Sequence, residues 1–96
     1  MPDTAPPVAV HNNTEKKRFE ATVEGHLAKA EYRLEPGLLV ITHTVVPPAL
    51  EGRGIGGALV RSALIHARTN GLKVKPECTY ARAYMQRHPE TQDLLA

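Results

Sequence analysis

Four glycines within six residues mark the segment best suited to bind a ligand: Gly52, Gly54, Gly56 and Gly57. A β-branched segment precedes them, and apolar residues at helical spacing follow. A loop that opens a helix presents unpaired backbone N–H groups at the positive end of the helix dipole, which suits a phosphate group. The alternative is a tight turn that uses glycine for its conformational freedom. A single glycine would favour the turn, whereas four favour a phosphate site.

Cys78 is the only cysteine and the first candidate for covalent chemistry. It lies between a predicted strand end and a predicted helix start, where a helix dipole favours the thiolate form. Arg82 follows one helical turn later, on the same face. The alternative is a small buried side chain, which is the usual situation of a free cysteine. Position alone favours this alternative.

His43 is the candidate general base. It interrupts a strand of otherwise aliphatic and threonine residues, and regular alternation puts it on one face with Leu39, Ile41 and Val45. Imidazole titrates near neutral pH, so a histidine here is suited to accept a proton from an incoming amine. The alternative is a core histidine that hydrogen-bonds to a neighbouring backbone carbonyl.

Two well-known phosphate motifs fit the glycine segment poorly. A Walker-type loop needs a Gly-Lys-Ser/Thr ending, which is absent. Gly52, Gly54 and Gly57 match the dinucleotide pattern G-x-G-x-x-G, and Glu77 follows at the spacing of its ribose-binding acid. The dinucleotide turn, however, follows its strand directly, whereas residues 47–51 intervene here.

Composition narrows the class of protein. The chain has 96 residues, of which 42% are hydrophobic and 23% charged, as expected for one globular domain. The net charge is only +2 and the basic residues are scattered, so we expect no nucleic-acid partner. The absence of a long apolar run predicts no membrane association, and the lack of a signal peptide with a single cysteine predicts a cytoplasmic protein. The histidines and Cys78 lack metal-ligand spacing, so we expect no metal.

Apolar periodicity predicts three antiparallel strands before the glycines, at 17–23, 26–34 and 38–46. Glu24-Gly25 is typical of a two-residue hairpin turn between the first two. The third strand is almost continuously apolar, which predicts a central strand covered on both faces.

Helices and one further strand are predicted after the glycines, at 54–69 (helix), 72–76 (strand), 78–87 (helix) and a short last helix from Pro89. A helix between two strands indicates a parallel crossover. The order β-β-β-α-β-α-α predicts a mixed α/β fold with a largely antiparallel sheet. Residues 1–13, with three prolines and no periodicity, predict a disordered tail, so that residues 14–96 form the single domain.

The segment from Val45 to Val60 resembles motif A of the GNAT superfamily of N-acetyltransferases, which reads R/Q-x-x-G-x-G/A. Gly54 and Gly56 stand at its two glycines, and Glu51 stands where the superfamily has Arg or Gln. Further segments are similar to the small, single-domain, YjdJ-type members of the superfamily: 41–44 leading into 46–47, 78–84 and 88–90. The resemblance covers residues 17–94.

This resemblance implies a minimal GNAT-like fold that binds acetyl-CoA. Backbone N–H groups of residues 53–57 would hold the CoA pyrophosphate. The strand end at Val45 and Val46 would pair with the pantetheine amides and point an N–H at the thioester carbonyl. The expected cofactor contacts are Val45, Val46, Glu51, Gly52, Arg53, Gly54, Ile55, Gly56, Gly57 and Cys78.

The resemblance also suggests catalytic residues. It places Cys78 in the cofactor site, and it implies that Tyr84 protonates the leaving CoA thiolate. The spacing to Tyr84 is one residue shorter than the common pattern. The expected catalytic set is therefore Cys78, His43 and Tyr84.

Two functions remain open from the sequence. The first is an N-acetyltransferase in which a primary amine attacks acetyl-CoA directly, with a route through acetyl-Cys78 as a variant. The second is a non-catalytic CoA or acetyl-CoA binding module that acts through a protein partner, because the acceptor-site elements of larger relatives are missing. The amine acceptor is not identified, and both a monomer and a weak homodimer are compatible with the sequence.

Overall fold

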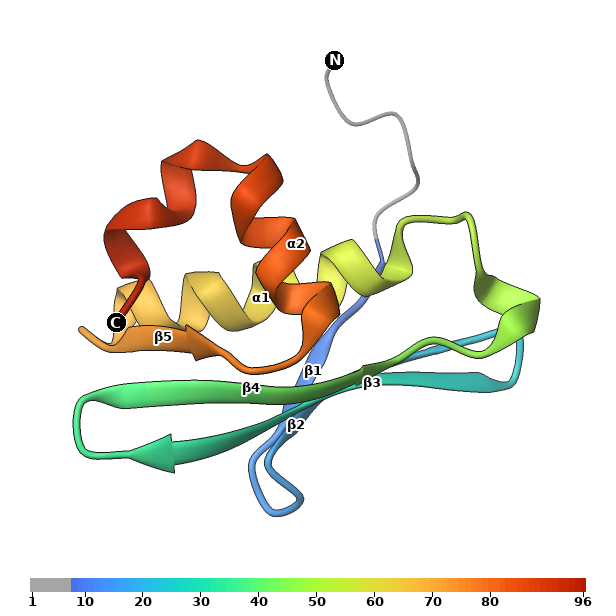
Figure 1. Cartoon of the computed structure of the whole chain (residues 1–96). Coiled ribbons are helices and arrows are strands. Elements are labelled where there is room, and N and C mark those ends of the chain that lie inside the picture. The colour runs from blue at the N-terminus through green and yellow to red at the C-terminus, as the bar shows by residue number, and fades with distance from the viewer. Residues whose placement is uncertain (1–7) are drawn as a thin grey trace.

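The computed structural model describes residues 8–96, which fold as one five-stranded sheet with helices on one side (Figure 1). The strands lie in the sheet in sequence order: β1 (His11–Asn13), β2 (Arg18–Val23), β3 (His26–Glu35), β4 (Leu38–Val45) and β5 (Lys73–Pro76). Neighbours pair antiparallel except β4 and β5, which are parallel. The predicted mixed fold with one parallel crossover is confirmed.

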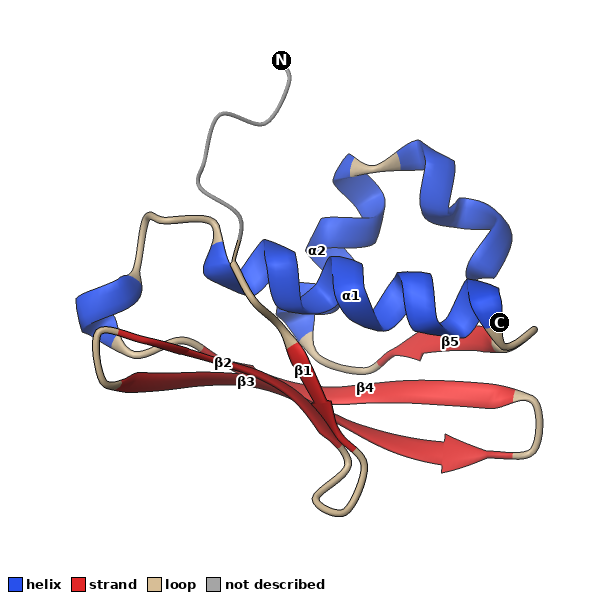
Figure 2. Ribbon diagram, turned by 180° about the vertical axis from the view of Figure 1, so that it is seen from behind, coloured by secondary structure: helices blue, strands red, loops and turns tan. Residues whose placement is uncertain are grey.

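Two α-helices, α1 (Ile55–Thr69) and α2 (Thr79–Arg87), pack on the same face of the sheet (Figure 2). Two short 3₁₀ segments, η1 (Pro48–Leu50) and η2 (Pro89–Leu94), flank them in the chain. Helix α1 turns one apolar stripe to the sheet, with buried residues Ile55, Leu59, Val60, Ala63, Leu64 and Ala67. No helix in the described part of the chain is long and apolar enough to cross a membrane.

Left-handed backbone conformations set the two ends of α1. Gly54 is the N-cap residue with φ of 76°, a conformation that glycine adopts without steric cost. At the other end Gly71 has φ of 69°, and the Leu72 N–H donates to the Ala67 carbonyl. The helix therefore begins and ends where its sequence predicts.

A β-bulge interrupts the pairing of β3 with β4. Glu31 lies opposite His43 and Tyr32 lies opposite Ile41, so Thr42 is the extra residue on β4. The Thr42 hydroxyl donates to the Glu31 carbonyl at 3.2 Å. The inserted residue reverses the alternation of side chains along the remainder of β4.

The prediction that His43 shares a face with Leu39 and Ile41 is therefore wrong. Beyond the bulge it is Thr44 that faces the helices, and it contacts Cys78 of the helical layer. His43 lies on the outer face opposite Glu31, and its side chain is 71% exposed. Alternation over a whole strand assumes an uninterrupted register, which a bulge breaks.

The prediction that β4 is covered on both faces is also wrong. Both α-helices lie on one face of the sheet. On the opposite face β3 carries mostly charged side chains. Val40 is nevertheless fully buried on that outer face, opposite Arg33 on β3 and Lys75 on β5. Long charged side chains cover apolar surface with their aliphatic stems, which explains a buried valine without a second layer.

The predicted tail ends earlier than residue 13. Residues 11–13 form the edge strand β1, and the Tyr32 hydroxyl donates to the Asn12 side-chain oxygen at 2.8 Å. Val8 and Val10 pack against the core. Three polar residues provide no alternation from which a strand is predictable. The remainder of the predicted tail, residues 1–7, lies outside the described residues.

Replacing Leu59 tests the core between α1 and the sheet. Leu59→Ala removes a fully buried side chain, so we expect the free energy of unfolding to fall by about 2–5 kcal/mol in urea denaturation. Ile65→Ala on the same helix is the control, because Ile65 is 54% exposed and its loss should be below about 1 kcal/mol. Equal losses for the two variants would contradict the assigned face of α1.

Candidate functional site

The site begins where β4 and β5 separate. Their parallel pairing ends at Ile41 and Pro76, and the Ile41 carbonyl oxygen accepts the N–H groups of Glu77 (2.9 Å) and Cys78 (3.2 Å). The chain then turns into α2, while β4 continues to Val45. No strand of the described chain pairs with this last part of β4 on the β5 side. An extended ligand can add to such a free strand edge.

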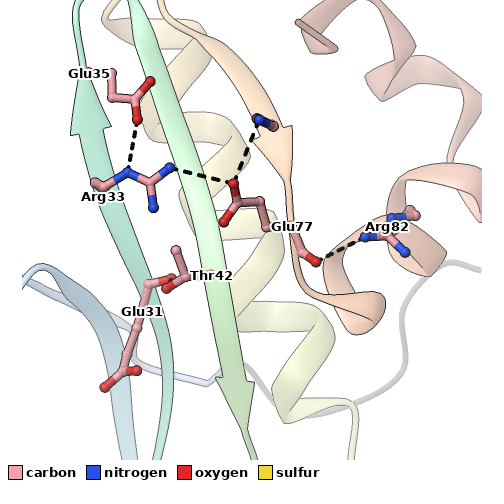
Figure 3. A network of polar contacts seen from close by, with 7 residues as sticks. Glu31, Arg33, Glu35, Thr42, Glu77 and Arg82 are labelled. Atoms are coloured by element: carbon pink, nitrogen blue, oxygen red, sulfur yellow. Dashed lines mark hydrogen bonds and ion pairs between the residues drawn. The ribbon is translucent and has the colours of Figure 1, made fainter.

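Polar contacts hold the end of β5 in place. Figure 3 shows Arg33 of β3 reaching across β4 to the Glu77 carboxylate, at 3.5 Å. Arg33 also pairs with Glu35 at 2.9 Å, and Lys75 lies 3.7 Å from Glu77. On the helical side, the Arg82 guanidinium donates to the Glu77 carbonyl at 2.9 Å. These contacts fix the point at which the two strands part.

The glycine loop leaves the first turn of α1 open to a ligand. Gly52 and Gly54 adopt φ of 82° and 76°, which turn the chain into the helix. The first intrahelical hydrogen bond runs from the Ala58 N–H to the Gly54 carbonyl, and no side chain caps the helix. The N–H groups before Ala58 therefore point out of the helix start, where its dipole favours an anion.

An open pocket of about 390 Å³ joins this loop to the free end of β4. Its lining includes six of the residues predicted to contact the cofactor: Val46, Glu51, Gly52, Gly54, Ile55 and Gly56. Three further lining residues were not predicted: Thr44, Leu50 and Tyr80. Thr44 was predictable as the alternate neighbour of Val46. Tyr80 carries a weaker signal, its place two residues after Cys78.

Cys78, a predicted cofactor contact, does not line this pocket but contacts Thr44, which does. It is the N-cap residue of α2, and its sulfur accepts the Ala81 N–H at 3.3 Å. The hydroxyl of Thr44 lies 3.4 Å from the same sulfur. The thiol is thus held between the strand edge and the helix start, half-buried and free of any disulfide.

The other predicted residues lie around the pocket at different places. The Val45 side chain points to the outer face, since Val45 lies opposite Lys29. Tyr84 stacks on His88 with ring centroids 4.0 Å apart, and its ring lies beside Gly57. Neither it nor Gly57 lines the pocket. Within residues 8–96, no group of three His, Cys, Asp or Glu side chains is placed to hold a metal ion.

Comparison with known proteins identifies the family. The family model described as GCN5-related N-acetyl-transferase matches residues 18–94. The chain belongs to this family. Protein NATD1 of Mus musculus is 29% identical over 91 residues, which cover 92% of this chain and 83% of that protein. Protein NATD1 of Homo sapiens is also 29% identical and is covered to 80%.

A solved structure supports the same assignment. The solution structure of a GCN5-like protein from Staphylococcus aureus superposes with a TM-score of 0.74 at 26% identity, covering 93% of this chain and 88% of that one. The sheet order and the helical layer are thus those of a small GCN5-related N-acetyltransferase domain.

In this member of the family, Arg53 of the loop does not line the pocket. Its guanidinium makes two hydrogen bonds to the Glu24 carboxylate, at 2.9 and 3.1 Å. Glu24 lies in the β2–β3 turn with φ of 52°, followed by Gly25 with φ of 80°, as in a type I′ turn. The pair ties the hairpin to the glycine loop, and a second hollow of about 410 Å³ lies beside it.

The pair predicts an acid-dependent stability. The hydrogen bond and charge of Arg53 lower the pKa of Glu24 in the folded chain, so its stabilisation is present at neutral pH and lost as the pH falls below about 5. We therefore expect the melting temperature of Glu24→Gln to fall less between pH 7 and pH 3 than that of the wild type, measured by circular dichroism. The melting temperature of Glu15→Gln should fall as much as that of the wild type, because Glu15 has no ion-pair partner among the described residues. Identical curves for Glu24→Gln and wild type would exclude this contribution.

Proposed function

We propose that the protein transfers acetyl from acetyl-CoA to a primary amine by direct attack. The observation that supports this most is the continuity of one pocket from the open start of α1 to the unpaired edge of β4. The start of α1 suits a pyrophosphate, and the free edge of β4 suits an extended arm that carries amides. A ligand with both groups would fit this one pocket. Acetyl-CoA is such a ligand and supplies the activated acetyl group.

In this proposal the backbone N–H groups of residues 53–57 bind the pyrophosphate. The edge at Thr44–Val46 pairs with the pantetheine amides, and an N–H there stabilises the oxyanion that forms as the amine attacks the thioester carbonyl. Removing one such donor costs other acyl-transfer enzymes about 2.7–4 kcal/mol of transition-state stabilisation. The fixed separation of β4 from β5 supports this role, because it keeps that edge open without any rearrangement.

His43 is the proposed base. Its position on the outer face, beside the open edge and opposite the cofactor side, lets the amine approach through the gap between the strands. The imidazole takes the proton that the amine nitrogen loses on forming the new C–N bond. The Glu31 carboxylate, 3.6 Å from Nδ1, orients the ring. The CoA thiolate leaves on the side of the Cys78 thiol, and proton donation by Tyr84 stays a prediction.

A non-catalytic CoA-binding module is the second candidate. One observation favours it: Glu51 is a lining residue of the pocket, and its carboxylate has no ion-pair partner among residues 8–96. Its N–H donates to the Pro48 carbonyl, so the backbone at this position is already used. Glu51 thus departs, within the pocket itself, from the Arg or Gln of the superfamily motif, which favours a domain that has kept the cofactor pocket without turnover.

Turnover separates the two functions. We expect the purified protein to bind acetyl-CoA in calorimetry and to release free CoA, detected with a thiol reagent, in the presence of a primary-amine acceptor from a screen of polyamines and lysine peptides. His43→Gln should lower the release rate at least tenfold with little change in acetyl-CoA affinity. Tight binding with no CoA release on any amine would favour the binding module.

A mass spectrum distinguishes the two routes of transfer. Direct attack predicts no acetyl adduct on Cys78 in a single turnover quenched before completion. A hydroxylamine-sensitive acetyl adduct on Cys78, formed and consumed at the turnover rate, would contradict direct attack and favour transfer through the thiol.

Removing the Glu51 charge should strengthen cofactor binding. Glu51→Gln relieves one like-charge interaction with the pyrophosphate, so we expect CoA to bind about threefold to tenfold tighter at low salt. The gain should shrink as added salt screens the charges. Glu15→Gln, in the turn between β1 and β2, removes the same charge outside the pocket and is the control. Unchanged CoA affinity in Glu51→Gln would mean that the CoA pyrophosphate binds away from Glu51.

A further inference from the structure

The aromatic ring of Tyr80 lies against the first turn of α1. A Cβ atom built on Gly56 would lie 2.4 Å from the Tyr80 hydroxyl oxygen and 2.5 Å from the ring carbon that bears it. A methyl group there would force the Tyr80 ring to move, so Gly56 and Tyr80 occupy complementary space. Gly56 is buried, and it is one of the pocket's lining residues together with Tyr80.

Glycine at position 56 permits this contact, whereas its backbone conformation does not need glycine. Unlike Gly52 and Gly54, Gly56 does not have a positive φ, so an alanine would fit the helical conformation. Glycine inside a helix is less favourable than alanine by about 1 kcal/mol. The close approach of the Tyr80 phenol is the feature of the structure that alanine would remove.

The Tyr80 hydroxyl is also available to a ligand. It has no hydrogen-bond partner among the described residues, and Tyr80 is 40% exposed. Tyr32, by contrast, donates its hydroxyl to Asn12. The Cys78 cap fixes the first turn of α2 and so directs Tyr80 toward the start of α1. A phenol donates a hydrogen bond without adding charge.

We propose that Tyr80 is the side-chain contact of the phosphate site, donating its hydroxyl to a phosphate oxygen held at the start of α1. Gly56 is then glycine because the phenol must reach that position. This inference rests on the proposed function, since it names a residue of the same pocket. Tyr80, in the first turn of α2 next to Cys78, would thus contact the phosphate at the first turn of α1.

The test compares single-atom changes at two tyrosines. In calorimetry, Tyr80→Phe should weaken CoA binding about tenfold, as expected for the loss of a hydrogen bond to a charged acceptor. The affinity of Tyr80→Phe for inorganic pyrophosphate, measured by competition with CoA, should fall by a similar factor. Tyr32→Phe is the matched control and should bind both ligands as the wild type does, because the Tyr32 hydroxyl contacts Asn12 outside the pocket.

A second pair of variants tests the contact with Gly56. Gly56→Ala should lower the melting temperature and weaken CoA binding, because the methyl group displaces the phenol. In a Tyr80→Ala background the same Gly56→Ala change should raise the melting temperature, since alanine is the better helix former. A loss of stability of equal size in both backgrounds would overturn the packing on which the inference rests.

The outcomes distinguish this inference from the proposed function. If the wild type binds no CoA, both are overturned. If the wild type binds CoA and Tyr80→Phe binds it equally well, the cofactor site stands and the role of Tyr80 is excluded. Weaker CoA binding with unchanged pyrophosphate competition would also overturn the inference, because the hydroxyl would then contact another part of CoA.

Discussion

The Ile41 carbonyl oxygen is the point on which the rest of the site depends. It accepts N–H groups from both Glu77 and Cys78, so it ends the parallel pairing and starts α2 at the same place. Because β5 leaves there, four residues of β4 continue with a free edge, and Cys78 is brought to the side of Thr44. A site for an extended ligand thus arises from where a strand stops, with no added domain.

The β-bulge at Thr42 divides the chemistry between the two faces of the sheet. It turns Thr44 toward the helices and the thiol, and it turns His43 toward the outer face beside Glu31. In the proposed mechanism the two sides then have different partners, the cofactor on the helical side and the amine on the outer side. A regular strand would have put His43 and Val45 with Ile41 and left Thr44 on the other face.

The sequence predicts those parts of the fold that follow from local physics. Glycines at Gly54 and Gly71 identify the ends of α1, and the Glu24-Gly25 turn identifies the first hairpin. The free edge of β4 and the face on which His43 lies are not predictable in this way, because each depends on pairing between distant strands. The role of Arg53 depends equally on such a contact, since its partner Glu24 lies 29 residues away in the chain. Spacing within one segment contains no information on these pairings.

Mapping backbone amides by NMR during an acetyl-CoA titration tests the central claim most directly, because the cofactor is proposed to bind through backbone N–H groups. The account predicts the largest shifts at residues 53–57 and along Thr44–Val46, with little change at the exposed Ile65 of α1. Shifts confined to the second hollow, at Val8, Thr22 and Val23, or no saturable shifts at all, would contradict it.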